Sequence, residues 1–510
     1  MAGEHQENNG GSVVQDTAHQ KALHGDGAAA AAARDDDDAA AVALDPTTFP
    51  ASLEHLSLSA RTVHADDYLN SHQSVAPPMH VSTTFRYNRD PDQLAPWSNI
   101  NPNNPHDSHV YSRDTAPNTL RLEAILTSIL GGPALTYSSG LAAFHALLVH
   151  LNPRRIAIGD GYHGCHGVIR VVAKLTGLRV VGLDCADGEL GPGDVVHVET
   201  PLNPTGEARD LEAYAAKARR AGAYLSVDAT FAPPPLLDPF RWGADVVMHS
   251  GTKYFGGHSD MLCGVLAVAP RHAYGGSGSG SKDGGGEKED EEEEEDKAKG
   301  KGWIPQLRDE RLVLGSVMGS FEGWLGVRSL RTLELRVRRQ SADAEKLVRW
   351  LADEVSNNQI KKKDNNTTTI TSSSASSSAA GNVVAAVQHA SLQPEASDPN
   401  SWLRRQMPHG YGAVFSVLMR DEQLARRLPS KLHLFHHATS LGGVESLVEW
   451  RAMTDRTVDR RLLRVSVGVE GWEDLRDDLV QGFEALLAEV AEGGGKLSGS
   501  DVGGSLQVMI

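Results

Sequence analysis

The sequence predicts an α/β fold in which a large, mostly parallel sheet is followed by a smaller carboxyl-terminal α+β domain. Between residues 120 and 268, strand-length apolar runs alternate with helix-length stretches, and this alternation is typical of a parallel sheet covered by helices. After Arg328 the alternation gives way to longer helical runs and fewer strands. A chain of 510 residues is long enough for more than one domain and a large core.

The elements of the large domain are predicted from short apolar runs that lie between turn-forming residues. Strands are expected at 134–137, 155–158, 178–183, 195–199, 224–227, 244–248 and 264–268, with helices that include 141–150 and 211–221. In the smaller domain we expect helices over 330–354 and 472–491, and strands near 413–418 and 463–467. Open α/β sheets bind ligands beyond the carboxyl ends of their strands, so residues in those positions are candidates for a site.

Charge and composition argue against several classes of protein. The 49 Lys and Arg residues against 66 Asp and Glu residues give a net charge of −17, which disfavours nucleic acid as a partner. Three cysteines without paired spacing predict neither a disulfide framework nor a metal site, and they indicate a reducing compartment. The sequence shows no apolar stretch of membrane-spanning length and no signal-peptide core. We therefore expect a cytoplasmic protein that does not bind a membrane.

Segments of low complexity suggest where the folded parts begin and end. Residues 275–302 form an acidic, Gly/Ser-rich stretch, and 357–381 are rich in Lys, Asn, Thr and Ser; both are predicted to be insertions in surface loops. The predicted domains are a disordered N-terminus (1–50), an N-terminal arm (51–120), an α/β domain (121–325), an α+β domain (326–495) and a tail (496–510).

Lys253 is the strongest candidate for a catalytic residue. It follows the predicted strand 244–248 within Ser-Gly-Thr-Lys-Tyr-Phe-Gly-Gly, where Ser250 and Thr252 place two hydroxyls beside it. This combination suits an amine held near a phosphate, as in a lysine that forms a Schiff base with pyridoxal phosphate (PLP). Taken alone, the segment favours a solvated lysine in a loop after a strand.

Asp228 provides a second signal at the end of another predicted strand, 224–227, twenty-five residues before Lys253. A carboxylate there would face the pyridine nitrogen of PLP and keep it protonated, which makes the ring an electron sink. The alternative is an aspartate that caps the turn before the prolines at 233–235. The pair at neighbouring strand ends is more informative than either residue alone.

These segments resemble the Cys/Met-metabolism (trans-sulfuration) family of PLP-dependent enzymes, and the resemblance extends from about Ser57 to about Leu487. It implies a PLP-dependent fold of type I (aspartate-aminotransferase-like), PLP as cofactor and a small sulfur amino acid as substrate. It also implies a homotetramer, built as a dimer of dimers with active sites shared across subunits.

The resemblance assigns cofactor-binding roles to several motifs. Ser139-Gly140-Leu141 would hold the phosphate at the start of a helix, whereas Tyr111 and Arg113 of the N-terminal arm would reach the phosphate of the neighbouring subunit's site. The other cofactor-binding residues implied are Tyr162, Asn203, Asp228, Thr230, Ser250, Thr252 and Lys253.

The resemblance also implies how the substrate is held and how protons move. Tyr162 would stack on the cofactor ring and assist proton transfer, so that it joins Lys253 as a catalytic residue. Asn203 and Ser440 would border the substrate, and Arg464 would clamp its α-carboxylate.

One motif near Tyr162 departs from the family pattern at two positions. The family usually has Tyr-Gly-Gly-Thr where this chain has Tyr162-His163-Gly164-Cys165. We expect His163 and Cys165 to be loop residues or modulators of substrate choice rather than a nucleophilic Cys–His pair.

The predicted function is that of a cystathionine β- or γ-lyase, which eliminates a thiol by breaking a C–S bond. Leu441 resembles the residue of γ-acting members, whereas Thr439 stands where several of them have glutamate. The alternatives are a γ-replacement transferase (cystathionine γ-synthase or O-acetylhomoserine sulfhydrylase), an aminotransferase of the same fold, and a degenerate PLP-binding protein.

Overall fold

The computed structural model describes residues 55–69, 74–94, 96, 109–274, 302–364 and 378–492. The predicted disordered N-terminus (1–50), nearly all of the acidic insertion (275–302) and the tail (496–510) lie outside the described residues. The sequence predictions on those segments therefore remain predictions.

The large domain is built on a seven-stranded sheet with the strand order β1-β7-β6-β5-β4-β2-β3. Only β7 runs antiparallel to its neighbours β1 and β6, and the remaining described pairings of this sheet are parallel. The predicted mostly parallel sheet is thus present, with one antiparallel strand. Its strands are β1 (Ala134–Tyr137), β2 (Arg155–Ile158), β3 (Arg179–Gly182), β4 (Val195–Glu199), β5 (Tyr224–Asp228), β6 (Val246–Ser250) and β7 (Gly264–Val268).

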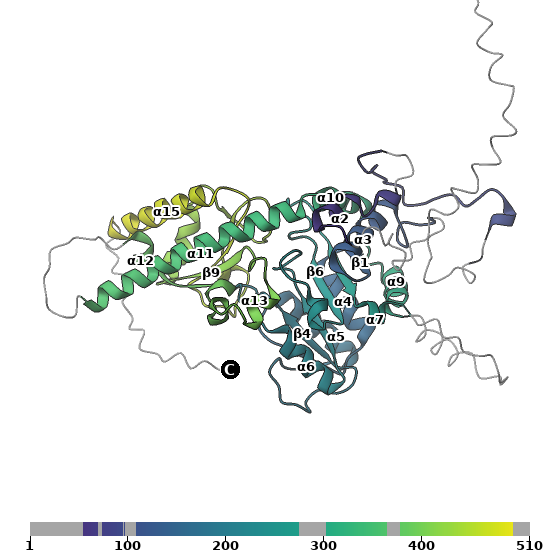
Figure 1. The fold of residues 1–510 in the computed structure, drawn as a ribbon, viewed down its shortest axis with the longest axis horizontal. Helices are drawn as coiled ribbons and strands as arrows, with labels where there is room; N and C mark the ends of the chain where they lie inside the picture. Colours follow the sequence, from purple (N-terminus) through teal and green to yellow (C-terminus); the bar gives the residue numbers. More distant parts are fainter. Residues whose placement is uncertain are drawn as a thin grey trace, which may run out of the picture. The chain divides into compact units, whose positions relative to one another are not determined.

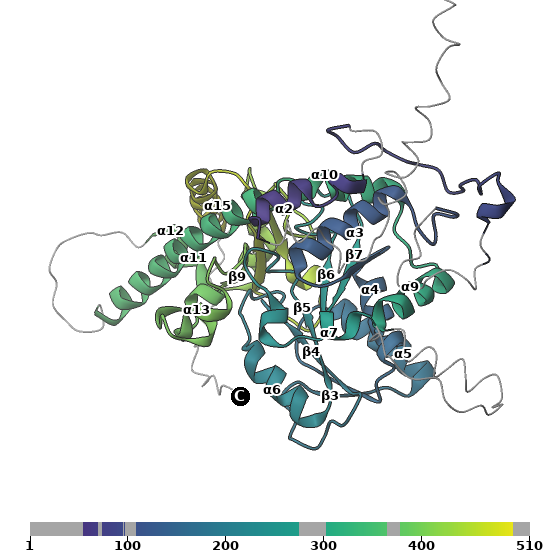
Figure 2. The ribbon, with the colours of Figure 1, turned by 45° about the vertical axis from the view of Figure 1, so that its right-hand side comes forward.

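Helices cover both faces of this sheet (Figure 2). Successive residues of a strand point to opposite faces, and accordingly Val246 and Met248 belong to one core while Val247 belongs to the other. The first core also contains residues of α4, α5 and α9, and the second contains residues of α3 and α6. These helices are α3 (Pro117–Leu130), α4 (Gly140–Leu151), α5 (His163–Thr176), α6 (Leu211–Ala221) and α9 (Trp303–Leu314).

The smaller domain contains a five-stranded sheet with the order β10-β11-β12-β9-β8. In Figure 1, β9 lies beside α11 in the green and yellow part of the chain, and α11 also packs against α12 and α15. The strands are β8 (Val384–Gln388), β9 (Val414–Met419), β10 (His436–His437), β11 (Leu447–Trp450) and β12 (Leu462–Ser466). The helices of this domain include α11 (Leu333–Asp364), α12 (Ala379–Val383), α13 (Trp402–Gln406), α14 (Glu422–Arg427) and α15 (Trp472–Glu492), whereas α2 (Leu58–His64) and α10 (Ser320–Leu330) pack against α3 of the large domain.

The predicted helix over 330–354 is wrong at both ends. Helix α10 ends at Leu330, and α11 runs from Leu333 to Asp364, which carries it into the segment that was predicted to be an insertion. The side chain of Asn358 is buried and donates a hydrogen bond to the carbonyl of Gly381. Gly381 lies well beyond the helix in the sequence. The polar composition of 357–364 alone therefore did not indicate that the helix continues through these residues.

Within the described ranges, none of the helices has both the length and the apolar character needed to cross a membrane. The same residues contain no group of three or more His, Cys, Asp or Glu side chains arranged to hold a metal ion.

Candidate active site

A cavity of about 380 Å³ is enclosed by the carboxyl ends of the large sheet and by residues of the smaller domain. Strands β1, β2, β4, β5 and β6 run in the same direction, so the residues that follow them meet at one edge of the sheet. The predicted site residues that line this cavity are Ser139, Gly140, Leu141, Tyr162, Asn203, Asp228, Thr230, Ser250, Thr252, Lys253, Ser440 and Arg464.

Asp228 is the last residue of β5, and its carboxylate lies on the cavity wall with little exposure to solvent. The backbone N–H and the hydroxyl of Thr230 donate to its Oδ1 at 3.0 and 2.5 Å. Burial raises the pKa of Asp228, and these hydrogen bonds oppose that shift. The backbone N–H of Ser250, the last residue of β6, donates in turn to Thr230 Oγ1 at 2.8 Å, so the carboxylate is held in a fixed orientation.

Lys253 lies three residues beyond the end of β6, and its Nζ donates to Ser440 Oγ at 2.9 Å. Burial, followed by the positive charge of Arg464, lowers the pKa of Lys253 from 10.5 to about 8. Ser440 has a φ of +85°, a conformation that non-glycine residues rarely adopt and that is enriched at functional sites. The protein thus holds an amine that is easily deprotonated inside the cavity.

The amino-terminal end of α4 forms another part of the wall. Ser139 caps this helix by accepting a hydrogen bond from the N–H of Ala142 at 3.1 Å. A Cβ at Gly140 would come within 3.0 Å of Ser250 Cβ, so glycine lets the helix end approach β6 closely. A helix start with backbone N–H groups and nearby hydroxyls is suited to an anion such as a phosphate.

Arg464, in the middle of β12, brings a cation to the cavity from the smaller domain. Its guanidinium donates to Asn203 Oδ1 at 3.2 Å and to the Ser440 carbonyl at 3.0 Å, and it pairs with Glu449 at 2.6 Å. Glu449 lies directly opposite Arg464 on β11. Burial lowers the pKa of Arg464 to about 10, which leaves it charged at neutral pH. Because the pair is buried, removing Glu449 would leave the Arg464 guanidinium without its ion-pair partner, at a cost of about 3–5 kcal/mol.

Tyr162 is the residue before α5, and its ring lies on the cavity wall. Its backbone N–H donates to Glu199 Oε2 at 2.7 Å, and the N–H of Asn203 donates to Glu199 Oε1 at 2.7 Å. Glu199 therefore joins the loops that carry Tyr162 and Asn203. Burial, and then the charge of Asp228 on the adjacent strand, raise the pKa of Glu199 to about 8.

Tyr111 and Arg113 are the two predicted site residues that are not among those lining the cavity in the described part of the single chain. Arg113 lies over the Tyr111 ring at 5.6 Å and donates to the Leu312 carbonyl at 3.0 Å, and Tyr111 is 44% exposed. The role predicted for them belongs to the site of another subunit, so it remains a prediction.

The two departures from the family pattern have different surroundings. His163 lines the cavity, whereas Cys165 is buried among apolar residues of the sheet–helix core and is not among the described lining residues of this cavity. Burial raises the pKa of Cys165 well above its ordinary value, which disfavours a nucleophilic thiolate.

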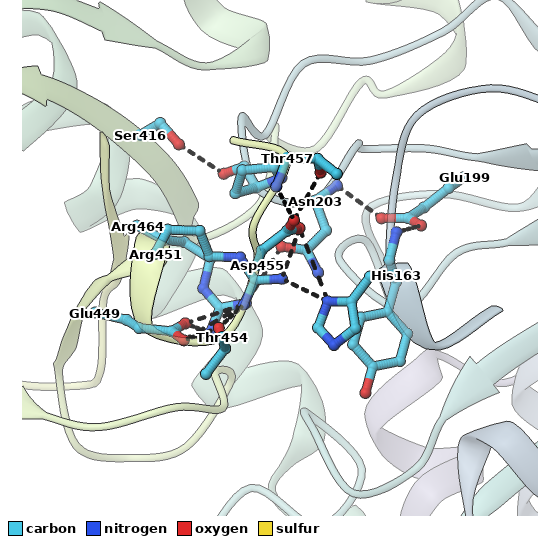
Figure 3. A network of polar contacts seen from close by, with 12 residues as sticks. His163, Glu199, Asn203, Ser416, Glu449, Arg451, Thr454, Asp455, Thr457 and Arg464 are labelled. Atoms are coloured by element: carbon cyan, nitrogen blue, oxygen red, sulfur yellow. Dashed lines mark hydrogen bonds and ion pairs between the residues drawn. The ribbon is translucent and has the colours of Figure 1, made fainter. Parts of the chain in front are cut away.

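Sequence reasoning missed a group of polar residues on the smaller domain's side of the cavity (Figure 3). Arg451 and Thr454 line the cavity and both contact Glu449. Arg451 also lies against His163, with Nη2 3.3 Å from Nδ1. Residues 163 and 451 are 288 positions apart in the chain, so the sequence carries no local signal of this contact.

Comparison with known proteins agrees with the geometry of this site. A family profile described as "Cys/Met metabolism PLP-dependent enzyme" matches residues 59–484, and the chain belongs to this family. It is 27% identical over 449 residues to cystathionine gamma-lyase of Saccharomyces cerevisiae, with 84% of this chain and 97% of that protein covered. It is 33% identical over 396 residues to cystathionine gamma-synthase of Mycobacterium tuberculosis, covering 73% and 85%.

A solved structure shares the fold. A methionine gamma lyase from Micromonospora echinospora superimposes with a TM-score of 0.63 at 29% identity, and the match covers 84% of this chain and 99% of that one. The fold is that of the PLP-dependent family, and the family and relatives support a PLP-dependent trans-sulfuration enzyme that acts on sulfur amino acids.

The cavity fits the cofactor that the family implies. PLP has an aldehyde, a ring nitrogen and a phosphate, and the cavity offers a group of suitable chemistry for each. These are the amine of Lys253, the buried carboxylate of Asp228 and the α4 amino terminus next to Ser250.

Proposed function

We propose that this chain is a cystathionine lyase that breaks the C–S bond of a thioether amino acid. The observation that carries the proposal is the juxtaposition of the Lys253 amine, the Asp228 carboxylate and the Arg464 guanidinium on one cavity of about 380 Å³. When bound, PLP supplies an electron sink that stabilises negative charge at the substrate's Cα. An amine, an acid and a carboxylate clamp are the groups that an elimination next to Cα requires.

The role that we propose for Lys253 is to hold the cofactor's aldehyde and, once released by the substrate, to move protons. An amine must be neutral to accept a proton. Because its pKa is lowered to about 8, about a tenth of the free amine is neutral at pH 7. The hydrogen bond to Ser440 Oγ keeps Nζ at the cavity wall, from which it would take the Cα proton and, for cleavage at Cγ, a Cβ proton.

Arg464 is proposed to hold the substrate's α-carboxylate, and Asp228 to hold the cofactor's ring nitrogen. Glu449 and the Ser440 carbonyl fix the guanidinium of Arg464, so it is oriented before substrate binds. A fixed carboxylate clamp determines which bond at Cα is aligned for cleavage. Tyr162 lies on the same wall, and burial raises the pKa of its phenol, which keeps a proton available for the leaving thiolate.

The position of the bond that is broken can be read from the products. Incubation of the purified holoenzyme with cystathionine and water is expected to yield cysteine, 2-oxobutyrate and ammonia if the Cγ–S bond breaks. Cleavage of the Cβ–S bond would yield homocysteine, pyruvate and ammonia instead. Leu441, which lines the cavity, favours the first outcome. Formation of neither oxo acid at a rate above that of a cofactor-only control would contradict the lyase proposal.

Replacement at Cγ is a second candidate function, favoured by the 33% identity to the mycobacterial cystathionine gamma-synthase. Such an enzyme would join cysteine to an activated homoserine ester and release the acid of the ester. The two functions separate in one assay, in which the ester is supplied with and without cysteine. Cystathionine formation would identify a transferase, and 2-oxobutyrate formation in both cases would identify a lyase.

We also propose that the active site is completed by a second subunit, because Tyr111 and Arg113 are away from the cavity of their own chain. Their side chains lie on one another, and Tyr111 is 44% exposed, so they are available to a neighbouring subunit. The Arg113→Ala and Lys253→Ala variants should each be inactive, because each lacks a group that every site needs. Subunits of the two variants, unfolded and reassembled together, are expected to regain up to about a quarter of the wild-type activity, as random pairing leaves one intact site in half of the dimers.

Verified mixed oligomers with no activity would contradict a shared site. Each variant reassembled alone serves as the control, because neither should regain activity by refolding.

A further inference from the structure

We propose that Arg451 and His163 form a second anion subsite in the cavity, which binds the distal carboxylate of a substrate that carries two carboxylates. The proposal deepens the proposed function, on which it rests, because it names the class of thioether that the site prefers. Arg464 and this subsite would then hold the two ends of one substrate.

Arg451 has the position and the free hydrogen-bonding capacity for such a role. Its side chain is 3% exposed and lines the cavity. Its Nη1 donates to Glu449 at 3.2 Å and to Thr454 Oγ1 at 3.0 Å, whereas its Nε has no hydrogen-bond partner among the described residues. A buried N–H of a charged group that stays unpaired is costly, so the protein contacts of Arg451 do not use its full capacity to donate.

The charges around Arg451 are also those of a site prepared for an anion. Arg451 and Arg464 share one carboxylate oxygen, Glu449 Oε2, at 3.2 and 2.6 Å. Asp455 is the other nearby acid, but its Oδ2 is 3.7 Å from Arg451 Nη2, beyond a normal hydrogen bond. Its Oδ1 accepts from the backbone and side chain of Thr457. Arg451 therefore shares Glu449 with Arg464, and the only other acid described near it, Asp455, is too far away for a hydrogen bond.

His163 contributes a second donor next to Arg451. Since a guanidinium can only donate, the 3.3 Å contact from Arg451 Nη2 makes His163 Nδ1 an acceptor. The proton of the neutral ring is then on Nε2, which is a donor. Figure 3 shows the imidazole beside Arg451 and Asp455. The ring is 46% exposed, so this subsite is at the open side of the cavity, as a distal group requires.

A carboxylate suits these donors because the planar guanidinium offers parallel N–H groups at the spacing of carboxylate oxygens. A substrate with one carboxylate would occupy Arg464 and leave the Arg451 side of the cavity without an anion. The subsite thus predicts a preference for a diacidic thioether such as cystathionine over a monoacidic one such as methionine.

The test compares these two thioethers, which give the same oxo acid when the Cγ–S bond breaks. In Arg451→Gln, kcat/KM for cystathionine is expected to fall by about tenfold to a hundredfold, as for loss of a charge-assisted hydrogen bond. The kcat/KM for methionine should stay within about twofold of the wild-type value. If methionine binds without being cleaved, its inhibition constant against cystathionine cleavage is compared instead. Arg456→Gln, an exposed arginine in the same loop, is the matched control and should change neither value.

An equal fall for both thioethers would overturn the proposal, because it would mean that Arg451 acts only by supporting Glu449 and, through it, Arg464. No change for either would overturn it as well. Arg451→Gln is set aside if it loses the cofactor's absorbance or its cooperative unfolding transition. In that case the same comparison of the two thioethers is made with His163→Ala, since the half-exposed His163 ring contributes less to folding. A loss confined to cystathionine supports the subsite, and any other pattern contradicts it.

Failure of the subsite can be distinguished from failure of the proposed function. If the wild-type holoenzyme cleaves neither thioether, the lyase proposal fails, and binding is then measured by the increase in unfolding temperature. Cystathionine should stabilise the wild-type holoenzyme more than methionine does, and Arg451→Gln should remove the difference. Equal stabilisation by the two compounds would reject the subsite.

Discussion

Replacing Lys253 with alanine is expected to lower kcat for cystathionine cleavage by at least about a thousandfold, because loss of a general base alone costs 10²–10⁴-fold and this residue also holds the cofactor. The Nζ lies on the cavity wall, 2.9 Å from Ser440 Oγ, and its pKa is lowered to about 8. In the described chain, no other lysine is among the residues that line this cavity.

The covalent role can be measured apart from activity. Borohydride treatment of the wild-type holoenzyme should attach the mass of the reduced cofactor to the peptide that contains Lys253, and Lys253→Ala should lose this labelling. Lys174→Ala, at an exposed lysine near the end of α5, is the control and should keep both labelling and activity. Retention of more than a few per cent of activity by Lys253→Ala would show that another group carries the proton.

Replacing Asp228 with asparagine is the second substitution with a large expected effect. We expect kcat to fall by about 10²–10³-fold, the range found when one preorganised electrostatic contact is removed. Asparagine keeps the size of the side chain and can still accept from Thr230, but it cannot balance the positive charge of a protonated ring nitrogen. The loss should therefore appear mainly in kcat, and the absorption band of the bound cofactor should shift because its ring nitrogen is no longer protonated.

Asp160→Asn is a suitable control, because this exposed aspartate follows β2 at the same edge of the sheet. It should leave kcat within about twofold of the wild-type value. An unchanged cofactor spectrum together with unchanged kcat in Asp228→Asn would mean that the carboxylate does not face the ring nitrogen.

The unfolding free energy provides an independent check on Asp228. Burial makes its carboxylate more expensive to ionise than in water and raises its pKa. Above the ordinary pKa of an aspartate, a raised native pKa means that the ionised form destabilises the apoprotein. Asp228→Asn apoprotein should therefore be at least as stable as the wild type at neutral pH, and this would separate a loss of catalysis from a loss of folding.

Many strands of the large domain were predictable from local runs of apolar residues. The runs at 134–137, 155–158, 195–199 and 264–268 are strands with the predicted bounds, because a strand buried on both faces must be apolar throughout. The short motifs around Lys253 and Asp228 follow such strands directly, so their position at the sheet edge was predictable as soon as the strands were recognised.

The smaller domain was harder to predict. Strands β8 and β11 were missed, and α11 continues ten residues beyond the predicted end. β8 pairs with β9, and β11 pairs with β12. Near the end of α11, the side chain of Asn358 donates a hydrogen bond to the Gly381 carbonyl. Such long-range contacts override local propensity.

By itself, the sequence determined the α/β class, the family resemblance, and the lysine and aspartate at the ends of two neighbouring strands, because each of these depends on periodicity or on a short contiguous motif. Only the tertiary structure decided which side chains share the cavity across the two sheets. It placed Arg451 against His163 and Glu449 against Arg464, and it buried Cys165 among the apolar residues of the core. The physical reason is that these contacts depend on the folded sheets: Arg451 and His163 are 288 positions apart in the chain, and Glu449 lies opposite Arg464 only once β11 and β12 have paired.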